Sequence, residues 1–437
     1  MRISVIGCGY LGAVHAACMA KLGHDVIGID VDERKIGELQ AGRAPFFEPG
    51  LPELLEEVLA TGRLKFSSSM ADAKGAQVHF LCVGTPQRKG EYAADMRYVD
   101  AAFLALLDSL EPGNVVAGKS TVPVGTAARL ADDLADCHPE AILAWNPEFL
   151  REGFAVKDTL TPDRFVYGVP EGAAGIAATA ALDEVYYTPL SMGTRRLTAD
   201  YATAELVKAA ANSFLATKIS FINAMAEVCE VTGADVTVLA DAIGMDERIG
   251  RKFLNAGVGF GGGCLPKDIR AFMARAGELG ANQALTFLRE VDDINVRRRM
   301  RVVELTRTLV GGSLLGKRIT VLGAAFKPNS DDVRDSPALS IAAQLQLQGA
   351  DVTVTDPEAI EGARRRFPEL SYEADLETAM AQADALLLLT EWDEYRAISP
   401  EMAGEIVSAK NLLDGRNVME PAAWRSAGWN YKGIGRP

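Results

Sequence analysis

The chain has 437 residues, of which 48% are hydrophobic, and at this length two or three separate hydrophobic cores are expected. Its 45 basic and 59 acidic side chains give a formal net charge of -14, which disfavours unspecific binding to nucleic acid or anionic lipid. No run approaches the roughly 20 apolar residues that a membrane span needs, and the N-terminal segment leaves no room for a signal peptide. We therefore expect a cytoplasmic protein that partners neither nucleic acid nor a membrane.

The cysteines and histidines do not form spaced clusters. Six cysteines and four histidines are scattered along the chain, whereas disulfide frameworks and zinc sites place such residues in close pairs. We expect no metal and a reducing environment, in which a single cysteine can serve as a nucleophile.

The N-terminal part alternates short apolar runs with helical patterns. Five of the runs predict buried strands, at residues 2–7, 24–30, 77–84, 114–120 and 141–148. Strands that alternate with helices indicate a doubly wound α/β domain, which we place at residues 1–196.

A long helix is expected next, over residues 198–231. This segment has no proline, and apolar residues recur at helical spacing at Leu206, Ala210, Phe214, Phe221, Met225 and Val228. Asp200 is suited to start the helix and Gly233 to end it. Such a helix would span about 45 Å, enough to connect two domains and to offer a dimer surface. We predict a helical dimerisation domain at residues 197–310.

Alternation resumes after residue 310, with apolar runs at residues 317–326, 350–357, 383–390 and 409–417. Residues 336–349 show a helical pattern between the first two runs. The predicted fold class is therefore α/β, with two Rossmann-like, doubly wound parallel-sheet domains joined by a long central helix and a helical region. The second sheet domain is placed at residues 311–437.

The clearest local motif is GCGYLG, in which Gly7, Gly9 and Gly12 stand between a predicted strand and a predicted helix. In dinucleotide-binding folds the first glycine permits a tight turn, the second lets backbone approach a pyrophosphate, and the third lets helix and strand pack closely. The alternative is a glycine turn without a ligand. In this context the motif favours a dinucleotide with its phosphates at the helix N-terminus.

Asp30 ends the next predicted strand, at a position where a carboxylate accepts hydrogen bonds from a ribose diol. Its charge would repel a 2'-phosphate, which favours NAD over NADP. Lys35 either flanks the ribose or belongs to a solvated helix face. Thr85, Ser120 and Thr121 follow two further strands, where an open parallel sheet binds its ligands, although such residues are also common in turns.

A second motif, VGFGGGCLPKD, places five glycines before Cys264, with Lys267 and Asp268 directly after it. Clustered glycine costs chain entropy and is expected where backbone approaches a ligand closely. Cysteine is usually buried and structural, but the neighbouring lysine can stabilise a thiolate. If an alcohol is first oxidised to an aldehyde, a thiolate can add to it, and a second oxidation then leaves a thioester that water hydrolyses to an acid. Simple alcohol dehydrogenation needs no such nucleophile.

Four further residues suit these steps. Glu148 and Glu152 would share a face if the stretch WNPEFLREG is helical, where they could orient water or move protons; a charged helix start is the alternative. Lys208 and Asn212 are also four residues apart, on the long predicted helix. Both can donate to an oxyanion, although a lysine among alanines can equally lie at the surface.

From end to end the chain resembles the UDP-glucose/GDP-mannose dehydrogenase family. The stretches that carry this resemblance are GCGYLG, CVGTP, KSTVPVGT, WNPEFLREG, ELVKAAANSFLATKISFINAMAEVCE, RIGRKFLNAGVGFGGGCLPKD, FKPNSDDVRDSP and LLDGRN. The resemblance implies an NAD-dependent, four-electron oxidation of the nucleotide sugar UDP-glucose to UDP-glucuronate, with two NAD reduced per substrate. It also implies a homodimer built around the long helix.

The resemblance further implies roles for individual residues. Cys264 would be the nucleophile, Lys208 and Asn212 would stabilise negative charge, and Asp268, Glu148 and Thr121 would handle water and protons. The cofactor would be bound by Gly7, Gly9, Leu11, Gly12, Asp30, Lys35, Thr85, Thr121, Glu152, Lys267 and Arg334. The nucleotide sugar would be bound by Glu148, Phe149, Leu150, Arg151, Glu152, Lys208, Asn212, Phe253, Leu254, Asn255, Gly257, Gly261, Lys327 and Arg416, with Arg248 entering the site of a partner subunit.

One departure from the family pattern is Gly263, where members commonly have serine; we expect it to alter loop stiffness more than chemistry. Members that act on N-acetylated sugars resemble VGGHC at this loop, whereas this chain has FGGGC.

Several alternatives stay open. They are the same chemistry on GDP-mannose or UDP-galactose, a single hydride transfer with a structural Cys264, as in a β-hydroxyacid dehydrogenase, and an NAD sensor without catalysis. Which of Glu148, Glu152 and Asp268 activates water also stays open.

Overall fold

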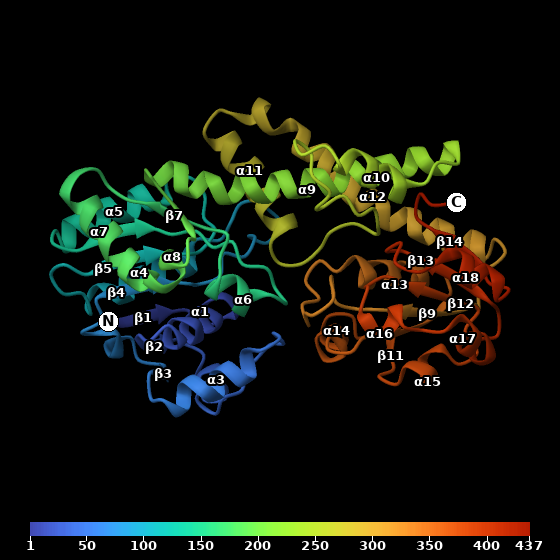
Figure 1. Cartoon of the computed structure of the whole chain (residues 1–437), viewed down its shortest axis with the longest axis horizontal. Coiled ribbons are helices and arrows are strands. Elements are labelled where there is room, and N and C mark those ends of the chain that lie inside the picture. Colours follow the sequence, from blue (N-terminus) through green and yellow to red (C-terminus); the bar gives the residue numbers. More distant parts are fainter. The chain divides into compact units, whose positions relative to one another are not determined.

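The computed structural model describes residues 1–437. The chain forms two compact units (Figure 1). Unit 1 comprises Met1–Ala211 and Arg270–Gly280, and unit 2 comprises Asn212–Ile269 and Ala281–Pro437. The division into three domains made from the sequence stays a prediction.

Unit 1 is built on an eight-stranded sheet with the strand order β3-β2-β1-β4-β5-β6-β7-β8. Its strands are β1 (Arg2–Ile6), β2 (Asp25–Ile29), β3 (Leu64–Ser67), β4 (Val78–Leu81), β5 (Val115–Gly118), β6 (Ile142–Trp145), β7 (Arg164–Gly168) and β8 (Arg195–Ala199). The order reverses between β1 and β4, and in open α/β sheets the carboxyl ends of the strands at such a point hold the ligand.

The five predicted strands are confirmed as β1, β2, β4, β5 and β6, and β3, β7 and β8 were missed. The parallel sheet expected from the sequence is confirmed, with one exception: β6 and β7 pair antiparallel through Trp145 and Gly168. Strand β8 escaped prediction because its residues RRLTA are largely exposed and show no apolar run.

Helices cover both faces of this sheet. They are α1 (Tyr10–Lys21), α2 (Glu33–Gln40), α3 (Leu51–Ala60), the 3-10 turn η1 (Met70–Ala73), α4 (Arg97–Leu107), α5 (Thr126–Cys137), α6 (Ala155–Leu160), α7 (Gly172–Val185) and α8 (Tyr187–Ser191). Successive strand residues enter opposite cores: Phe80 packs in the core that contains residues of α1 and α3, and Leu81 in the core that contains residues of α4 and α5. Both faces of the sheet are therefore buried.

The predicted long helix is α9 (Tyr201–Thr232), with residues 198 and 199 belonging to β8 instead. The predicted caps are confirmed. The Asp200 carboxylate accepts from the Thr203 amide at 2.8 Å, and Gly233 takes the left-handed conformation (φ 79°) that ends the helix. The boundary between the two units falls inside α9 and inside α11 (Leu265–Glu278).

Unit 2 contains a six-stranded, parallel sheet in the order β11-β10-β9-β12-β13-β14. Its strands are β9 (Arg318–Leu322), β10 (Asp351–Thr355), β11 (Ser371–Tyr372), β12 (Ala385–Leu388), β13 (Asn411–Asp414) and β14 (Asn430–Gly433). The four predicted strands are β9, β10, β12 and β13. The expectation of two Rossmann-like sheets and a long helix is confirmed.

The remaining helices are α10 (Val236–Gly244), the 3-10 turn η2 (Asn282–Leu285), α12 (Thr286–Leu309), α13 (Pro337–Leu347), α14 (Ile360–Arg366), α15 (Leu376–Met380), α16 (Asp393–Arg396), α17 (Pro400–Ile406) and α18 (Pro421–Ser426). The helical pattern predicted at residues 336–349 is α13, whose N-cap Ser336 accepts from the Leu339 amide. None of the helices has the length and apolar character needed to cross a membrane. The cytoplasmic location stays a prediction.

The end of β5 offers a test of how tightly unit 1 is packed. A Cβ at Gly118 would lie 2.1 Å from the Trp145 ring, which is fully buried and cannot move aside. We expect Gly118→Ala to lower the free energy of unfolding by about 1–3 kcal/mol in urea denaturation. The control Gly37→Ala, on α2 where a Cβ meets nothing within 4 Å, is expected to raise it by about 0.5–1 kcal/mol. Equal stabilities of the two variants would contradict this packing.

Candidate active site

The glycine-rich turn of unit 1 lies between β1 and α1, where the strand order reverses. Gly7 is left-handed (φ 89°), and its amide donates to the Ile29 carbonyl at 2.7 Å. A Cβ at Gly12 would lie 1.8 Å from the Gly7 carbonyl oxygen, so only glycine allows the helix to pack on the turn. Gly9 is the N-cap of α1 and faces open space, which leaves the helix N-terminus accessible to a phosphate.

Asp30 follows β2 and is held by three donors. Its carboxylate accepts from the Cys8 amide and the Lys35 ammonium, both at 2.8 Å, and from the Asp32 amide at 3.0 Å. A carboxylate has about four acceptor positions, so one is left for a ribose hydroxyl. Lys35 is therefore the ion-pair partner of Asp30. The turn and the carboxylate together fit the pyrophosphate and the ribose diol of NAD.

The hydroxyl residues predicted at the strand ends lie side by side. The Thr85 hydroxyl donates to the Thr121 carbonyl at 2.8 Å, and the Ser120 hydroxyl donates to the Val83 carbonyl at 2.6 Å. These bonds join the segments that follow β4 and β5, so Thr85 and Thr121 occupy the same ligand-binding edge as the glycine turn.

The segment that carries Glu148 and Glu152 is not a helix, so the condition under which the two carboxylates would share a helix face is not met. Residues 146–154 form a loop between β6 and α6. One Glu148 oxygen accepts from the Leu150 amide, and the other lies 3.6 Å from the Lys119 ammonium. Glu152 is buried.

A buried carboxylate far upstream shapes this loop. Glu48, 1% exposed, accepts from the Gly153 amide at 2.7 Å and from the Ala155 amide at 2.6 Å, where it caps α6. The Tyr10 hydroxyl, from the first turn of α1, also donates to Glu48 and accepts from the Gly153 amide. Glu48 therefore connects the glycine turn with residues 146–154, which carry Glu148 and Glu152 and are called the carboxylate loop below. No local motif in the sequence indicates this role.

Five other predicted residues lie in or near this loop in unit 1. The Phe149 ring lies 4.0 Å from the Arg164 guanidinium and 5.5 Å from the Lys208 ammonium. Arg151 forms a two-bond ion pair with Asp158, at 2.6 and 2.8 Å. Leu11 and Leu150 are half-buried against the core. Lys208 is thus brought to the carboxylate loop rather than left at the surface.

The loop before Cys264 belongs to unit 2 and is held by two buried asparagines. Asn223 of α9 accepts from the Gly257 amide at 2.8 Å. Asn295 of α12 accepts from the Phe260 amide at 2.7 Å and donates to the Phe260 carbonyl at 3.0 Å. Both asparagine side chains are fully buried. The loop path is therefore set by side chains on two long helices.

The last glycines of this loop leave no room for side chains. A Cβ at Gly261 would lie 2.4 Å from the Asp335 carbonyl oxygen, and one at Gly262 (φ 83°) would lie 2.7 Å from the Phe326 ring. At Gly263 the obstacle is the Arg334 guanidinium, at 2.3 Å. The family serine would thus displace Arg334, which is a steric effect beyond the loop stiffness expected from the sequence.

Cys264 stands at the N-terminus of α11, and its carbonyl accepts the first helical hydrogen bond, from the Asp268 amide at 2.9 Å. Its side chain is exposed. A helix N-terminus stabilises negative charge, which suits a thiolate. Burial raises the pKa of Cys82 to about 12 and also raises the pKa values of Cys8, Cys18 and Cys229. Those four thiols stay protonated at neutral pH.

Asp268, one turn into α11, is buried at 3% exposure and pairs with two predicted residues. One oxygen accepts from the Asn212 side-chain amide at 2.6 Å, and the other accepts from the Lys267 ammonium at 2.6 Å. Asn212 lies in α9, one helical turn after Lys208. The structure therefore brings Asn212 of α9 together with Lys267 and Asp268, which closely follow Cys264 in the sequence.

Two of the predicted arginines of unit 2 lie in segments that follow strands, Arg334 between β9 and α13 and Arg416 just after β13. Arg334 is paired with Asp332, which also accepts from the Gly263 amide at 3.3 Å. The Arg416 guanidinium donates to the Leu389 carbonyl at 2.7 Å and to the Phe326 carbonyl at 3.2 Å. It also lies close to the position where a Cβ of Gly257 would stand.

The other predicted substrate residues of unit 2 differ in exposure. Lys327 is half-buried, with its ammonium 5.4 Å from the Phe326 ring. Phe253 is left-handed (φ 66°) and exposed, Leu254 is buried, and Asn255 accepts from Arg251 at 2.7 Å. Arg248 is strongly exposed and paired only with Asp246, two residues before it.

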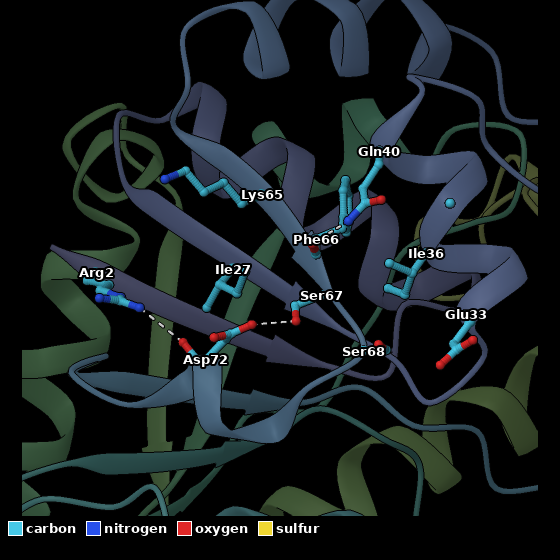
Figure 2. A pocket seen from close by; sticks show the side chains of 11 residues that line it. Arg2, Ile27, Glu33, Ile36, Gln40, Lys65, Phe66, Ser67, Ser68 and Asp72 are labelled. Atoms are coloured by element: carbon cyan, nitrogen blue, oxygen red, sulfur yellow. Dashed lines mark hydrogen bonds between the residues drawn. The ribbon is translucent and has the colours of Figure 1, made fainter.

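A pocket of about 560 Å³ lies elsewhere in unit 1, between α2 and the end of β3 (Figure 2). Figure 2 shows Arg2 and Ser67 both directed toward Asp72. Ile27 also lines the pocket. No cysteine or histidine lines this pocket, and neither the glycine turn nor Glu148 does. It is not the place where the predicted chemistry would occur.

Two Rossmann-like sheets, a glycine turn after the first strand with a carboxylate after the second, and an exposed cysteine at a helix N-terminus are typical of a nucleotide-dependent oxidoreductase. Comparison with known proteins gives the family. Residues 1–189 match the NAD binding domain of the UDP-glucose/GDP-mannose dehydrogenase family, residues 202–297 its central domain and residues 320–421 its UDP binding domain. The chain belongs to this family of NAD-dependent dehydrogenases, whose substrates are nucleotide sugars.

Individual relatives match the whole chain. A UDP-glucose 6-dehydrogenase of Rhizobium meliloti is 42% identical, with 100% of both chains covered. A solved UDP-glucose dehydrogenase from Pyrobaculum islandicum has a TM-score of 0.89 at 37% identity, covering 100% of this chain and 98% of that one. A UDP-D-ManNAc dehydrogenase from Pyrococcus horikoshii has a TM-score of 0.87 at 28% identity, covering 100% and 99%.

The environment of Asp30 predicts the cofactor preference. Asp30→Ala removes the ribose acceptor and leaves the Lys35 ammonium free to meet a 2'-phosphate. We expect the ratio of kcat/KM for NAD to that for NADP to fall by about tenfold or more, as for the loss of a charge-assisted hydrogen bond. The control is Asp25→Ala, at an exposed carboxylate at the start of β2. An unchanged ratio in Asp30→Ala would show that this carboxylate does not select the ribose.

Proposed function

We propose that the chain oxidises the primary alcohol of UDP-glucose to the carboxylate of UDP-glucuronate through a thioester on Cys264. The observation that carries the proposal is an exposed cysteine at the N-terminus of α11, one helical turn from the Asn212–Asp268 pair. A single alcohol-to-aldehyde step needs no nucleophile, whereas oxidation to the acid requires the aldehyde to be held as an adduct that can be oxidised again.

Bound NAD would accept one hydride in each of the two oxidation steps. Between them, the Cys264 thiolate adds to the aldehyde carbon, and the new carbon–sulfur bond gives a thiohemiacetal. Oxidation of this adduct leaves a thioester, and water then breaks the carbon–sulfur bond to release the carboxylate and the thiol. Overall, one alcohol and one water yield one carboxylate with the loss of two hydrides and three protons.

The polar residues have separate tasks in this scheme. Lys208 and the Asn212 amide would donate to the oxygen that becomes negative in the alcohol and aldehyde steps. Asn212 is held for this by its bond to Asp268 at 2.6 Å. Glu148, with Thr121 and Asp268, would accept the protons released when water attacks the thioester. Glu152 and Arg334 would bind the cofactor.

The substrate assignment rests on the relatives and on the glycine-rich loop before Cys264. Relatives at 37–42% identity are named UDP-glucose dehydrogenases, and the named UDP-D-ManNAc dehydrogenase is 28% identical. The loop sequence FGGGC also lacks the histidine of VGGHC. The Phe253–Gly257 segment, Gly261, Lys327 and Arg416 would bind the nucleotide sugar. Oxidation of GDP-mannose or UDP-galactose by the same route is the alternative.

We further propose a homodimer built on α9. Phe214, Phe221 and Val228 stand seven residues apart on this helix and are each about half exposed, and Val231 is almost fully exposed. Such a stripe recurs on one helix face and is costly to leave in water. The strongly exposed Arg248 guanidinium would then reach the site of the partner subunit.

The reaction stoichiometry tests this function. We expect two NADH per UDP-glucose consumed by the wild type and less than about a hundredth of the wild-type rate for Cys264→Ser, because serine is a far poorer nucleophile. GDP-mannose is the comparison substrate, and exposed Cys137→Ser is the matched control. One NADH per substrate would contradict the thioester route and support a single alcohol dehydrogenation. Binding of NAD without formation of any NADH would support an NAD sensor without catalysis.

Lys208 should act in the transition state rather than in binding. We expect Lys208→Ala to lower kcat by about 10²–10³, as for the loss of an oxyanion donor, and to change KM for UDP-glucose by less than about threefold. Exposed Lys74→Ala is the control. An effect confined to KM would remove Lys208 from the catalytic residues.

A further inference from the structure

A lysine that the mechanism above does not use lies buried beside Glu148. Lys119 directly follows β5, and its amide donates to the Leu81 carbonyl of β4 at 2.9 Å. Its side chain then turns into unit 1 and is only 5% exposed. The ammonium lies 5.8 Å from the centre of the Phe80 ring and 5.7 Å from that of the Tyr186 ring. Lysine is almost never buried to this degree unless it is paired.

The Lys119 ammonium has two neutral hydrogen-bond partners, the side chains of Asn146 and Tyr186. Lys119 donates to the Asn146 side-chain oxygen at 3.1 Å, and the Tyr186 hydroxyl donates to the same oxygen at 2.7 Å. The Asn146 amide nitrogen is engaged with the Val166 carbonyl at 3.0 Å, so its oxygen must face the ammonium. The Tyr186 hydroxyl itself lies 3.3 Å from Lys119.

Only one of the titratable groups near Lys119 is an anion. The nearby His15 and Cys82 are neutral, because burial lowers the pKa of His15 and raises that of Cys82. The counter-ion is Glu148, whose oxygen lies 3.6 Å from the ammonium and whose side chain is 18% exposed. The other Glu148 oxygen accepts from the Leu150 amide. The two oxygens are thus oriented by one backbone amide and one buried cation.

We propose that Lys119 is a positioning residue for Glu148, a buried cation that orients this carboxylate for the hydrolytic step. Taking an ammonium out of water is costly, and a methionine of similar length would fill the same space without that cost. A purely structural role would therefore be served as well by an apolar side chain. The proposal rests on the proposed function, in which Glu148 accepts a proton during thioester hydrolysis.

A double-mutant cycle tests this dependence. The variants are Lys119→Met, Glu148→Gln and the combination, with Lys157→Met as the matched control at an exposed lysine of α6. We expect Lys119→Met to lower kcat by about tenfold or more, with KM for NAD unchanged, because a misplaced general base slows only its own step. In the Glu148→Gln background the same substitution should change kcat by less than about twofold, since residues that act as one unit are not additive.

Each outcome decides a different point. Wild-type kcat in Lys119→Met, or effects of the two substitutions that multiply, would overturn the role of Lys119 while leaving the thioester route intact. Wild-type kcat in Glu148→Gln would contradict the role of Glu148 itself. Circular dichroism establishes that each variant is folded. If Lys119→Met is not, Lys119→Gln keeps a polar group opposite Asn146 without the charge and serves in the same cycle.

Discussion

The position of the Cys264 thiol depends on hydrogen bonds between two buried asparagines and the backbone before it. Asn295 exchanges two bonds with Phe260, and Asn223 accepts from the Gly257 amide. An unpaired buried amide costs about 1–3 kcal/mol, so these bonds hold the loop in one path. That path brings the loop to the start of α11, where the thiol is exposed and meets the positive end of the helix. The proposed chemistry follows from this placement.

The two Rossmann-like sheets carry an aspartate at the same topological position, but in different surroundings. Asp30 follows the second strand of unit 1 and keeps an acceptor position after its three bonds. Asp356 follows β10 in unit 2 and is 3% exposed. It accepts from the amides of Ala324, Ala325, Glu358 and Ala359 and from the Trp392 indole.

Five donors saturate the Asp356 carboxylate, which leaves nothing for a ribose diol. The difference between the two aspartates explains how one fold can serve two purposes in this chain. Unit 1 matches an NAD binding domain and unit 2 carries the match to a UDP binding domain. The carboxylate that keeps a free acceptor position in the first sheet is used to stabilise a turn in the second.

Features that are determined by the spacing of neighbouring residues could be predicted from the sequence. The glycine turn, Asp30, the caps of α9 at Asp200 and Gly233, and the apolar strands all depend on residues close together in the chain. Strand β8 could not be predicted in this way. β8 is exposed and rich in arginine, so it has no apolar pattern.

The shape of the site could not be predicted either, because its supports lie far away in sequence. Glu48 caps a loop more than 100 residues downstream, and Lys119 faces Glu148 from another strand. Asn223 and Asn295 sit within helices, where nothing in the local pattern distinguishes them from surface residues.

The central claim is a covalent bond between Cys264 and the sugar carbon that is oxidised. The most direct test is mass spectrometry of Glu148→Gln incubated with NAD and UDP-glucose and quenched in acid, because slowed hydrolysis should let the thioester accumulate. We expect a nucleotide-sugar adduct on the peptide that contains Cys264 and on no other cysteine peptide. Formation of UDP-glucuronate with Cys264 unmodified throughout would contradict it.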